Sequence, residues 1–196
     1  MELEYAYECT LSILVENQPS ILTRVIGLLS RRGFIIDSLA IGSTEYDGLS
    51  RIVIVLLGNL RLIDQLTRQL YKVLPTIKIF NLTNSPSITR ELILAKIFAK
   101  STERHEIFEI AQVFDLNIID YTKKIITLEI TGDRKKIIAI EQMLHKFGIL
   151  EKVRTGKIGI TRESLAAGQL YTIDREHIRR KILNSHIAEI EAKIYL

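Results

Sequence analysis

The feature that most constrains the fold of this chain is an order of elements that the sequence repeats. Between residues 9 and 82, hydrophobic alternation and helical spacing predict a strand, a helix, two strands, a helix and a strand in succession. The same order is predicted again between residues 92 and 154. Such a unit favours an antiparallel sheet with two helices on one face. We therefore expect two small α+β units in tandem.

The first half shows this pattern most clearly around its first helix. Residues 9–15 alternate between apolar and polar positions, as in a strand. Pro19 suits the first turn of the helix that follows, and Ser20 is placed to cap it. Gly33 is expected to end this helix, because the left-handed conformation is cheap only for glycine. The remaining predicted elements of this half are strands over residues 35–41, 52–57 and 77–82, and a helix over residues 60–72.

A turn-rich segment, residues 83–87, separates the second half from the first. The second half is predicted to contain strands over residues 92–98, 117–121, 125–131 and 150–154, and helices over residues 103–114 and 133–146. We therefore predict an α+β fold of two consecutive ferredoxin-like (βαββαβ) units, residues 1–84 and 85–163. Isoleucines at helical spacing predict an amphipathic helical extension over residues 164–196.

Composition excludes several classes of protein. No apolar run reaches the roughly 18 residues that a membrane span needs. Residues 1–8 have neither the apolar core of a secretory signal nor the basic character of a transit peptide. The single cysteine, Cys9, cannot form an internal disulfide, which favours a reducing compartment. The net charge is +4, and acidic residues flank the densest basic runs, as on an ordinary solvated surface.

The sequence contains no evident catalytic constellation. The chain has four histidines: His105, His145, His177 and His186. They are far apart and have no Cys or carboxylate partner at metal-ligand spacing. Cys9 lies on the apolar face of its predicted strand, which favours packing over reactivity. Residues 156–162 lack the spacing of a phosphate-binding loop. We expect no catalytic residue, metal site or cofactor on this chain.

A sheet that recognises RNA is a competing interpretation for basic ferredoxin-like units. Such sheets stack bases on aromatic side chains of their central strands. The corresponding strands here, "RIVIVLL" and "IITLEI", contain no aromatic residue. This absence argues against a sheet that binds nucleic acid.

The loop "ENQPS", residues 16–20, joins the first strand to the first helix without spare residues. The N–H groups at a helix start lack partners and lie at the positive end of the helix dipole, so they bind small anions. The loop either binds a small carboxylate ligand or only turns the chain, and the pattern itself leaves both interpretations open.

The segment "ILVENQPSILTRVIGLLSRRGFIIDSL" closely resembles the start of the regulatory small subunits of acetolactate synthase (acetohydroxyacid synthase), which is an ACT domain. The similarity continues at "LSRIVIV", "TRELILAKI" and "FGILEKVRTGKIGITRE", over residues 7–163. The resemblance implies a non-catalytic subunit that activates the large subunit and mediates feedback inhibition by valine in branched-chain amino-acid biosynthesis. Thiamine diphosphate, Mg²⁺ and FAD are then expected on the large subunit.

The resemblance also implies an effector site. In the family, an Asn before the helix, a Gly at the helix start and an Asn opening the second strand bind valine across a dimer interface. Here Asn17 matches the first position, whereas Ser20 replaces the Gly and Ile35 replaces the second Asn. The implied effector-binding residues are Asn17, Ser20, Ile21, Ile35 and Ile36. The two replacements predict weakened valine binding or a preference for another ligand.

The expected partners are the large subunit, an amino-acid effector and a second copy of the chain, without nucleic acid or membrane. A homodimer through the ACT domain is expected, because a single sheet leaves one face uncovered and one edge exposed. The alternative class is a stand-alone amino-acid-sensing or RNA-binding module. Frequent Ile and Lys suggest an AT-rich genome. The expected location is therefore the cytoplasm of a bacterium or the stroma of a plastid.

Overall fold

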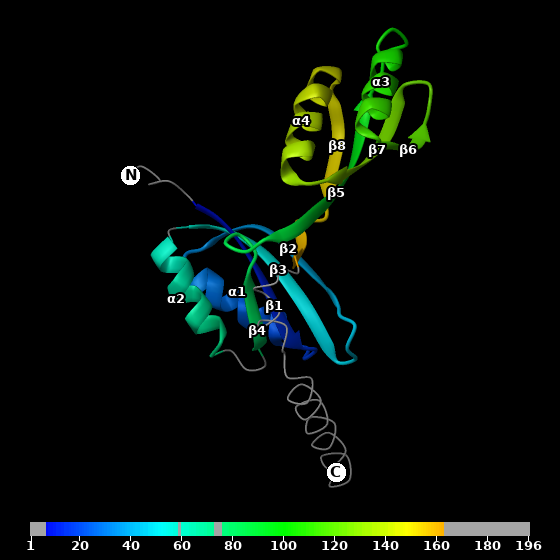
Figure 1. Ribbon diagram of the computed structural model, residues 1–196. Helices are drawn as coiled ribbons and strands as arrows, with labels where there is room; N and C mark the ends of the chain where they lie inside the picture. Colours follow the sequence, from blue (N-terminus) through cyan, green and yellow to red (C-terminus); the bar gives the residue numbers. More distant parts are fainter. Residues whose placement is uncertain (1–6, 59, 73–75, 163–196) are drawn as a thin grey trace.

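The computed structural model describes residues 7–58, 60–72 and 76–162. The chain forms two antiparallel sheets, each with two helices on one face, and strand β5 (Ser87–Phe98) runs between them (Figure 1). The predicted α+β fold with two successive βαββαβ units is therefore confirmed. The extension expected at residues 164–196 lies outside the described residues.

The first unit has its strands in the order β2-β3-β1-β4. Its elements are β1 (Tyr7–Glu16), α1 (Ile21–Arg31), β2 (Ile35–Ser43), β3 (Leu49–Gly58), α2 (Leu60–Leu70) and β4 (Thr76–Asn81). The apolar third strand is central, as its composition predicts, and β2 is an edge. Alternate residues of the central strands pack against the helices, and the core includes Leu11, Ile13, Val25, Leu29, Ile52 and Ile54.

The first helix begins directly after Ser20 and ends near Gly33 as predicted, but Pro19 lies before the helix rather than in its first turn, and the start is not capped as expected. Ser20 occupies the cap position, and its hydroxyl makes no capping hydrogen bond within the described structure. The helix ends at Arg31, and Gly33 follows with a φ of +71°. Glycine adopts this left-handed conformation without the steric cost of a Cβ atom.

The second unit repeats the arrangement, with its strands in the order β6-β7-β5-β8. Its further elements are α3 (Arg104–Phe114), β6 (Asn117–Tyr121), β7 (Ile125–Gly132), α4 (Arg134–Leu144), the 3-10 turn η1 (His145–Phe147) and β8 (Ile149–Arg154). Asp133 caps α4, because its side chain accepts a hydrogen bond from the backbone N–H of Lys136 at 2.8 Å. The helix is shorter than predicted because its last turn tightens into η1 before Gly148.

The sequence pattern missed one strand, β9 (Ile158–Thr161). This strand pairs with the first residues of β5, from Ser87 opposite Thr161 to Arg90 opposite Ile158. The β5–β9 ribbon lies against the helix-free face of the first sheet, where a Cβ atom on Gly159 would lie 2.9 Å from Leu82 Cδ1. That face was expected to be uncovered, and the ribbon covers part of it.

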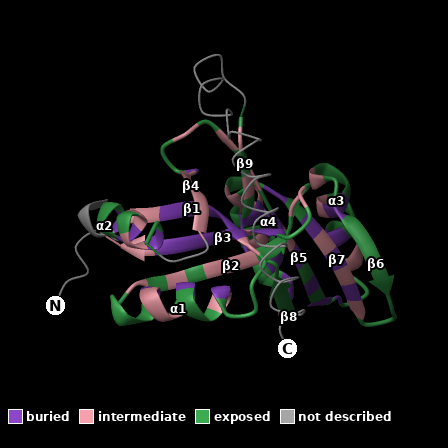
Figure 2. Ribbon diagram, turned by 90° about the horizontal axis from the view of Figure 1, so that it is seen from below, coloured by how far each residue is buried: buried purple, intermediate pink, exposed green. Residues whose placement is uncertain are grey.

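Burial follows the sheet order. Figure 2 shows buried residues concentrated in central strands such as β1 and β3, whereas the edge strand β6 is exposed along its whole length. Within the described part of the chain, no helix is long and apolar enough to cross a membrane.

Candidate functional site

Backbone hydrogen bonds hold the loop before α1 in a tight turn. The Asn17 N–H donates to the Gly48 carbonyl at 2.7 Å, and the Ile21 N–H donates to the Gln18 carbonyl at 3.1 Å. Asn17 and Ser20 are exposed, whereas the side chain of Ile21 is buried in the core. The first turn of α1 contains no acidic residue. The positive end of the helix dipole at Ser20 is therefore open to a small anion.

The other two predicted effector residues open strand β2. Ile35 pairs with Leu57 and has 55% of its surface exposed. Ile36 points the other way and packs against the first core. Ile35 therefore offers an apolar contact at the sheet edge, and Ile36 contributes mainly through its backbone.

A single chain does not bring the loop before α1 close to the start of β2. Glu16, next to Asn17, lies opposite Leu49 on β3, whereas Ile35 lies opposite Leu57 on the same strand. Eight residues of extended strand span about 26 Å. Residues from the two ends of the sheet can meet around one small ligand only if a second copy supplies one of the groups.

The described residues offer little chemistry for catalysis. His105 is exposed and lies 3.3 Å from Glu109 one helical turn away, as on an ordinary solvated helix. Cys9 is fully buried, and burial raises the pKa of its thiol, so the thiolate is disfavoured. No group of three or more His, Cys, Asp or Glu side chains in residues 7–58, 60–72 and 76–162 is placed to hold a metal ion. His177 and His186 lie outside the described residues.

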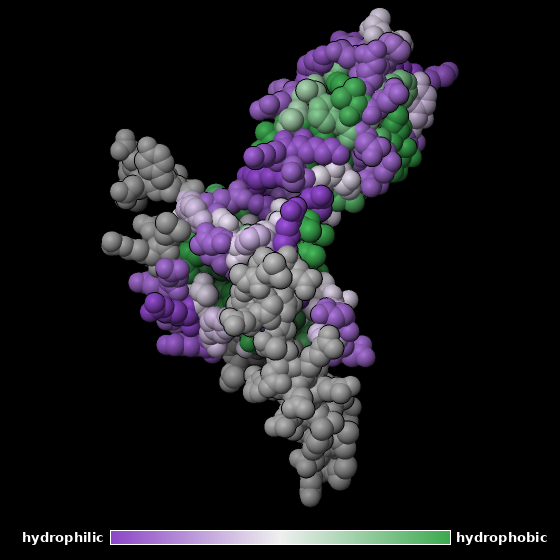
Figure 3. Space-filling view, in the orientation of Figure 1, coloured by the Kyte–Doolittle hydropathy of each residue, from purple (hydrophilic) through white to green (hydrophobic). Residues whose placement is uncertain are grey.

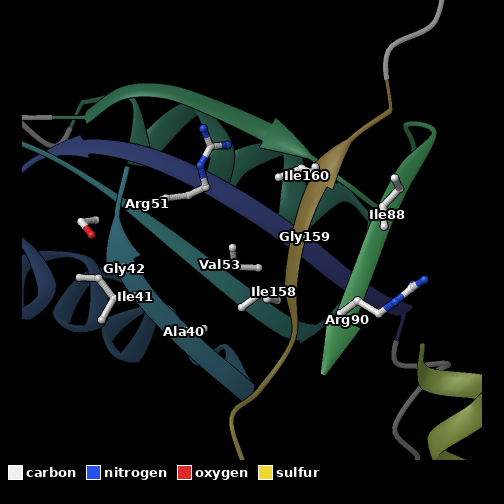
Figure 4. Close-up of a pocket in the computed structure, with 11 residues that line it drawn as sticks. Ala40, Ile41, Gly42, Arg51, Val53, Ile88, Arg90, Ile158, Gly159 and Ile160 are labelled. Carbon is white, nitrogen blue, oxygen red and sulfur yellow. The ribbon is translucent and has the colours of Figure 1, made fainter. Parts of the chain in front are cut away.

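The structure adds an apolar groove that the sequence pattern did not predict. It has a volume of about 390 Å³ and lies between β2 and β3 on one side and the β5–β9 ribbon on the other (Figure 4). Val53, Ile88 and Ile158 line it, and Arg51 and Arg90 lie on different sides of it. The side chain of Val53 lies on the helix-free face of the sheet, so the groove is distinct from the predicted effector residues. It escaped prediction because β9 was not recognised as a strand.

The fold and the loop together define an ACT-type module followed by a second ferredoxin-like unit. Residues 11–78 match the family model described as "AHAS small subunit-like ACT domain". Residues 90–163 match the model described as "Small subunit of acetolactate synthase". The two matches together cover both units of the structure.

Relatives and a solved structure agree with the two family matches. A probable acetolactate synthase small subunit of Archaeoglobus fulgidus is 42% identical over 153 residues, which cover 78% of this chain and 96% of that protein. The chloroplastic acetolactate synthase small subunit 2 of Arabidopsis thaliana is 45% identical over 155 residues, but this match spans only 32% of that longer protein. The crystal structure of the acetolactate synthase small subunit from Thermotoga maritima superposes with a TM-score of 0.74 at 33% identity, covering 81% of this chain and 99% of that one. The chain belongs to the acetolactate synthase small-subunit family.

Proposed function

We propose that this chain is the regulatory subunit of an acetolactate synthase, which raises the activity of a catalytic large subunit and makes it sensitive to a branched-chain amino acid. The observation that carries the proposal is the match of both units to the family over nearly the whole length of the Archaeoglobus relative. Thiamine diphosphate, Mg²⁺ and FAD belong, in this proposal, to the large subunit.

The proposed effector site lies between two copies of the chain. One copy contributes Asn17, Ser20 and the backbone of Ile21, and the other contributes Ile35 and Ile36. The exposed edge of β2 supports this arrangement, because edge strands pair readily with another chain. The open start of α1 supports a carboxylate ligand, and exposed Ile35 supports a ligand with an aliphatic side chain.

Two substitutions relative to the family pattern lower the proposed affinity for valine. Ile35 cannot donate or accept the hydrogen bond of an Asn side chain, and a lost hydrogen bond to a charged group costs about 1.5–3 kcal/mol. This corresponds to about one to two decades of affinity. The Ser20 side chain takes up space where the family has a glycine, which adds a steric cost. Its hydroxyl makes no capping bond in the described structure, so it is available to a ligand carboxylate and offsets part of the loss.

The test reconstitutes the chain with its cognate large subunit and measures acetolactate formation with and without valine, leucine or isoleucine. The chain alone is expected to turn over no pyruvate, and its addition is expected to raise the rate of the large subunit. An unchanged rate at saturating chain concentration contradicts the proposal. Recovery of a thiamine-dependent synthase with the chain from its source cells separates a regulatory subunit from a stand-alone sensor.

Calorimetry and light scattering test the effector site itself. The double change Ser20→Gly with Ile35→Asn is expected to tighten valine binding by about one to two decades. Equal affinities in the two proteins would show that the substitutions are neutral. A monomeric mass for the full chain at micromolar concentration would contradict a site shared between two copies.

A further inference from the structure

Strand β2, which contains Ile35 and Ile36, has a β-bulge at the following residue, Asp37. Ile36 lies opposite Leu56 and Ser38 opposite Val55, so Asp37 is an extra residue without a partner on β3. Such a bulge turns a side chain out of the regular ladder. Its effect here is to direct the Asp37 carboxylate away from the sheet edge and towards the second unit.

Asp37 contacts two arginines of the second unit. Its Oδ2 accepts a hydrogen bond from Arg154 Nη2 at 3.1 Å and lies 3.7 Å from Arg134 Nη1. Arg154 ends β8, and Arg134 begins α4. In addition, a Cβ atom on Gly156 would lie 3.1 Å from Ser38 Cβ. Asp37 and Ser38 therefore both contact the second unit, and they directly follow the proposed effector residues in the sequence.

The ion pairs at this junction are more enclosed than most surface pairs. Arg154 Nε also lies 3.4 Å from Glu91, whose side chain is only 2% exposed. Glu8 of β1 lies 3.2 Å from Arg134 and 2.5 Å from Lys157. The network therefore contains three carboxylates and three cations, whose charges balance: Glu8, Asp37, Glu91, Arg134, Arg154 and Lys157. Figure 3 shows strongly hydrophilic residues gathered at the end of the second unit that faces the first. Such a network has a defined geometry and resists small displacements more than exposed pairs do.

Two carboxylates of the first unit add to the negative charge that Asp133 supplies at the start of helix α4. Its first turn contains no acidic residue and begins with Arg134. A cation at the positive end of a helix dipole is unfavourable. Within the described part of the chain, Glu8 and Asp37 of the first unit form ion pairs with Arg134 at this end. A displacement of β2 therefore changes the electrostatic environment of α4 directly.

From this geometry we propose that Asp37 transmits effector binding from β2 to the second unit, so that the ligand changes how the second unit sits on the first. The inference rests on the proposed function and adds the route of regulation to it. Asp37 is a positioning residue: it acts through Arg154 and Arg134 and does not touch the effector. Coupling between sites of this kind changes affinities by about 5–150-fold, and it acts equally in both directions.

The experiment replaces Asp37 with Asn in the full chain, which keeps the shape of the side chain and removes its charge. Arg154 is left unchanged, because its loss would leave the buried Glu91 without a cation. Whichever of valine, leucine and isoleucine binds the wild-type chain serves as the probe, with binding measured by calorimetry. In the wild type, the effector is expected to change hydrogen exchange at the start of α4 and at residues 154–157. In Asp37→Asn, binding persists and these distant changes disappear.

The reconstituted enzyme supplies a second readout, the ratio of its rates without and with saturating effector. This ratio is expected to fall about fivefold or more in Asp37→Asn. Asp37→Glu, which keeps the charge, should restore it. Glu151→Gln is the control, because it removes an exposed ion pair with Lys96 inside the second unit.

The outcomes separate the two proposals. If the wild-type chain binds no branched-chain amino acid and leaves the rate of the large subunit unchanged, the proposed function is wrong and the coupling falls with it. If the wild type binds a branched-chain amino acid and raises the rate of the large subunit, the function stands. If Asp37→Asn then keeps the same rate ratio and the same exchange changes, the coupling is refuted. Loss of effector binding together with loss of folded structure in both Asp37 variants would show that Asp37 is only structural, which also refutes the coupling.

Discussion

Of the ion pairs that the described residues form between the two units, that of Lys157 with Glu8 is the most enclosed, and its removal tests the junction. Its side chain is 8% exposed, and its Nζ lies 2.5 Å from Glu8 Oε1 and 3.4 Å from Thr10 Oγ1. The change Lys157→Met keeps an aliphatic stem of similar length and removes the charge. The experiment therefore measures the ion pair rather than the packing of the stem.

The expected loss follows from the surroundings of Glu8. Removing one partner of a buried ion pair costs about 3–5 kcal/mol, because the other charge is left uncompensated. Glu8 keeps Arg134 at 3.2 Å, and its side chain is 29% exposed. We therefore expect a smaller loss, about 1.5–3 kcal/mol, as for a hydrogen bond to a charged group.

Urea denaturation followed by far-ultraviolet circular dichroism measures this loss, since the chain contains no tryptophan to report by fluorescence. The matched control is Lys96→Met, which removes a 2.6 Å ion pair with Glu151 whose side chains are 50% and 59% exposed. Exposed pairs contribute little, so the control should be indistinguishable from the wild type. Equal stability of Lys157→Met and Lys96→Met would refute the view that the junction holds the units together.

Three further predictions test packing, capping and the buried thiol. Gly159→Ala should lose about 1–3 kcal/mol of unfolding free energy, because its Cβ would overlap neighbouring side chains, whereas Gly42→Ala, with open space around it, should lose nothing measurable in urea. Asp133→Ala should lose about 0.5–2 kcal/mol, because it removes a capping hydrogen bond, whereas Ser20→Ala should leave the melting temperature unchanged, since no such bond exists there. Burial raises the pKa of Cys9, so the folded thiol stays neutral at a pH where the unfolded thiol ionises. The free energy of unfolding should therefore fall as pH rises above about 8.5. Cys9→Ala should remove this part of the pH dependence of the urea midpoint.

Much of the fold could be predicted because the decisive signals are local. Apolar alternation places β1, an almost wholly apolar run places β3, and helical spacing places α1. Gly33 and Gly48 adopt the positive φ values that their turns require. These signals depend on neighbours in sequence, so one sequence is enough to read them. The antiparallel order of the strands then follows from the short connections between elements.

Strand β9 could not be predicted for the opposite reason. None of its four residues is buried, and its partners, residues 87–90 of β5, precede it by about 70 residues, a separation that no local pattern reveals. The same strand pairing extends β5 to Ser87, five residues earlier than predicted. The groove and part of the junction depend on β9, so they were missed together.

The candidate site shows the same division between local and distant information. Asn17, Ser20 and Ile35 are all exposed, and the family resemblance implies a site across a dimer interface. The strand register adds that about 26 Å of sheet separates the loop from Ile35 in one chain. Asp37 also escaped notice, because a single carboxylate in a strand looks like ordinary surface until its partners at residues 134 and 154 are known. The proposed ligand site between two copies and the Asp37 contacts between the two units are both non-local features. Regulation by this chain would require them, since a signal that stayed within one sheet could not reach a partner bound elsewhere.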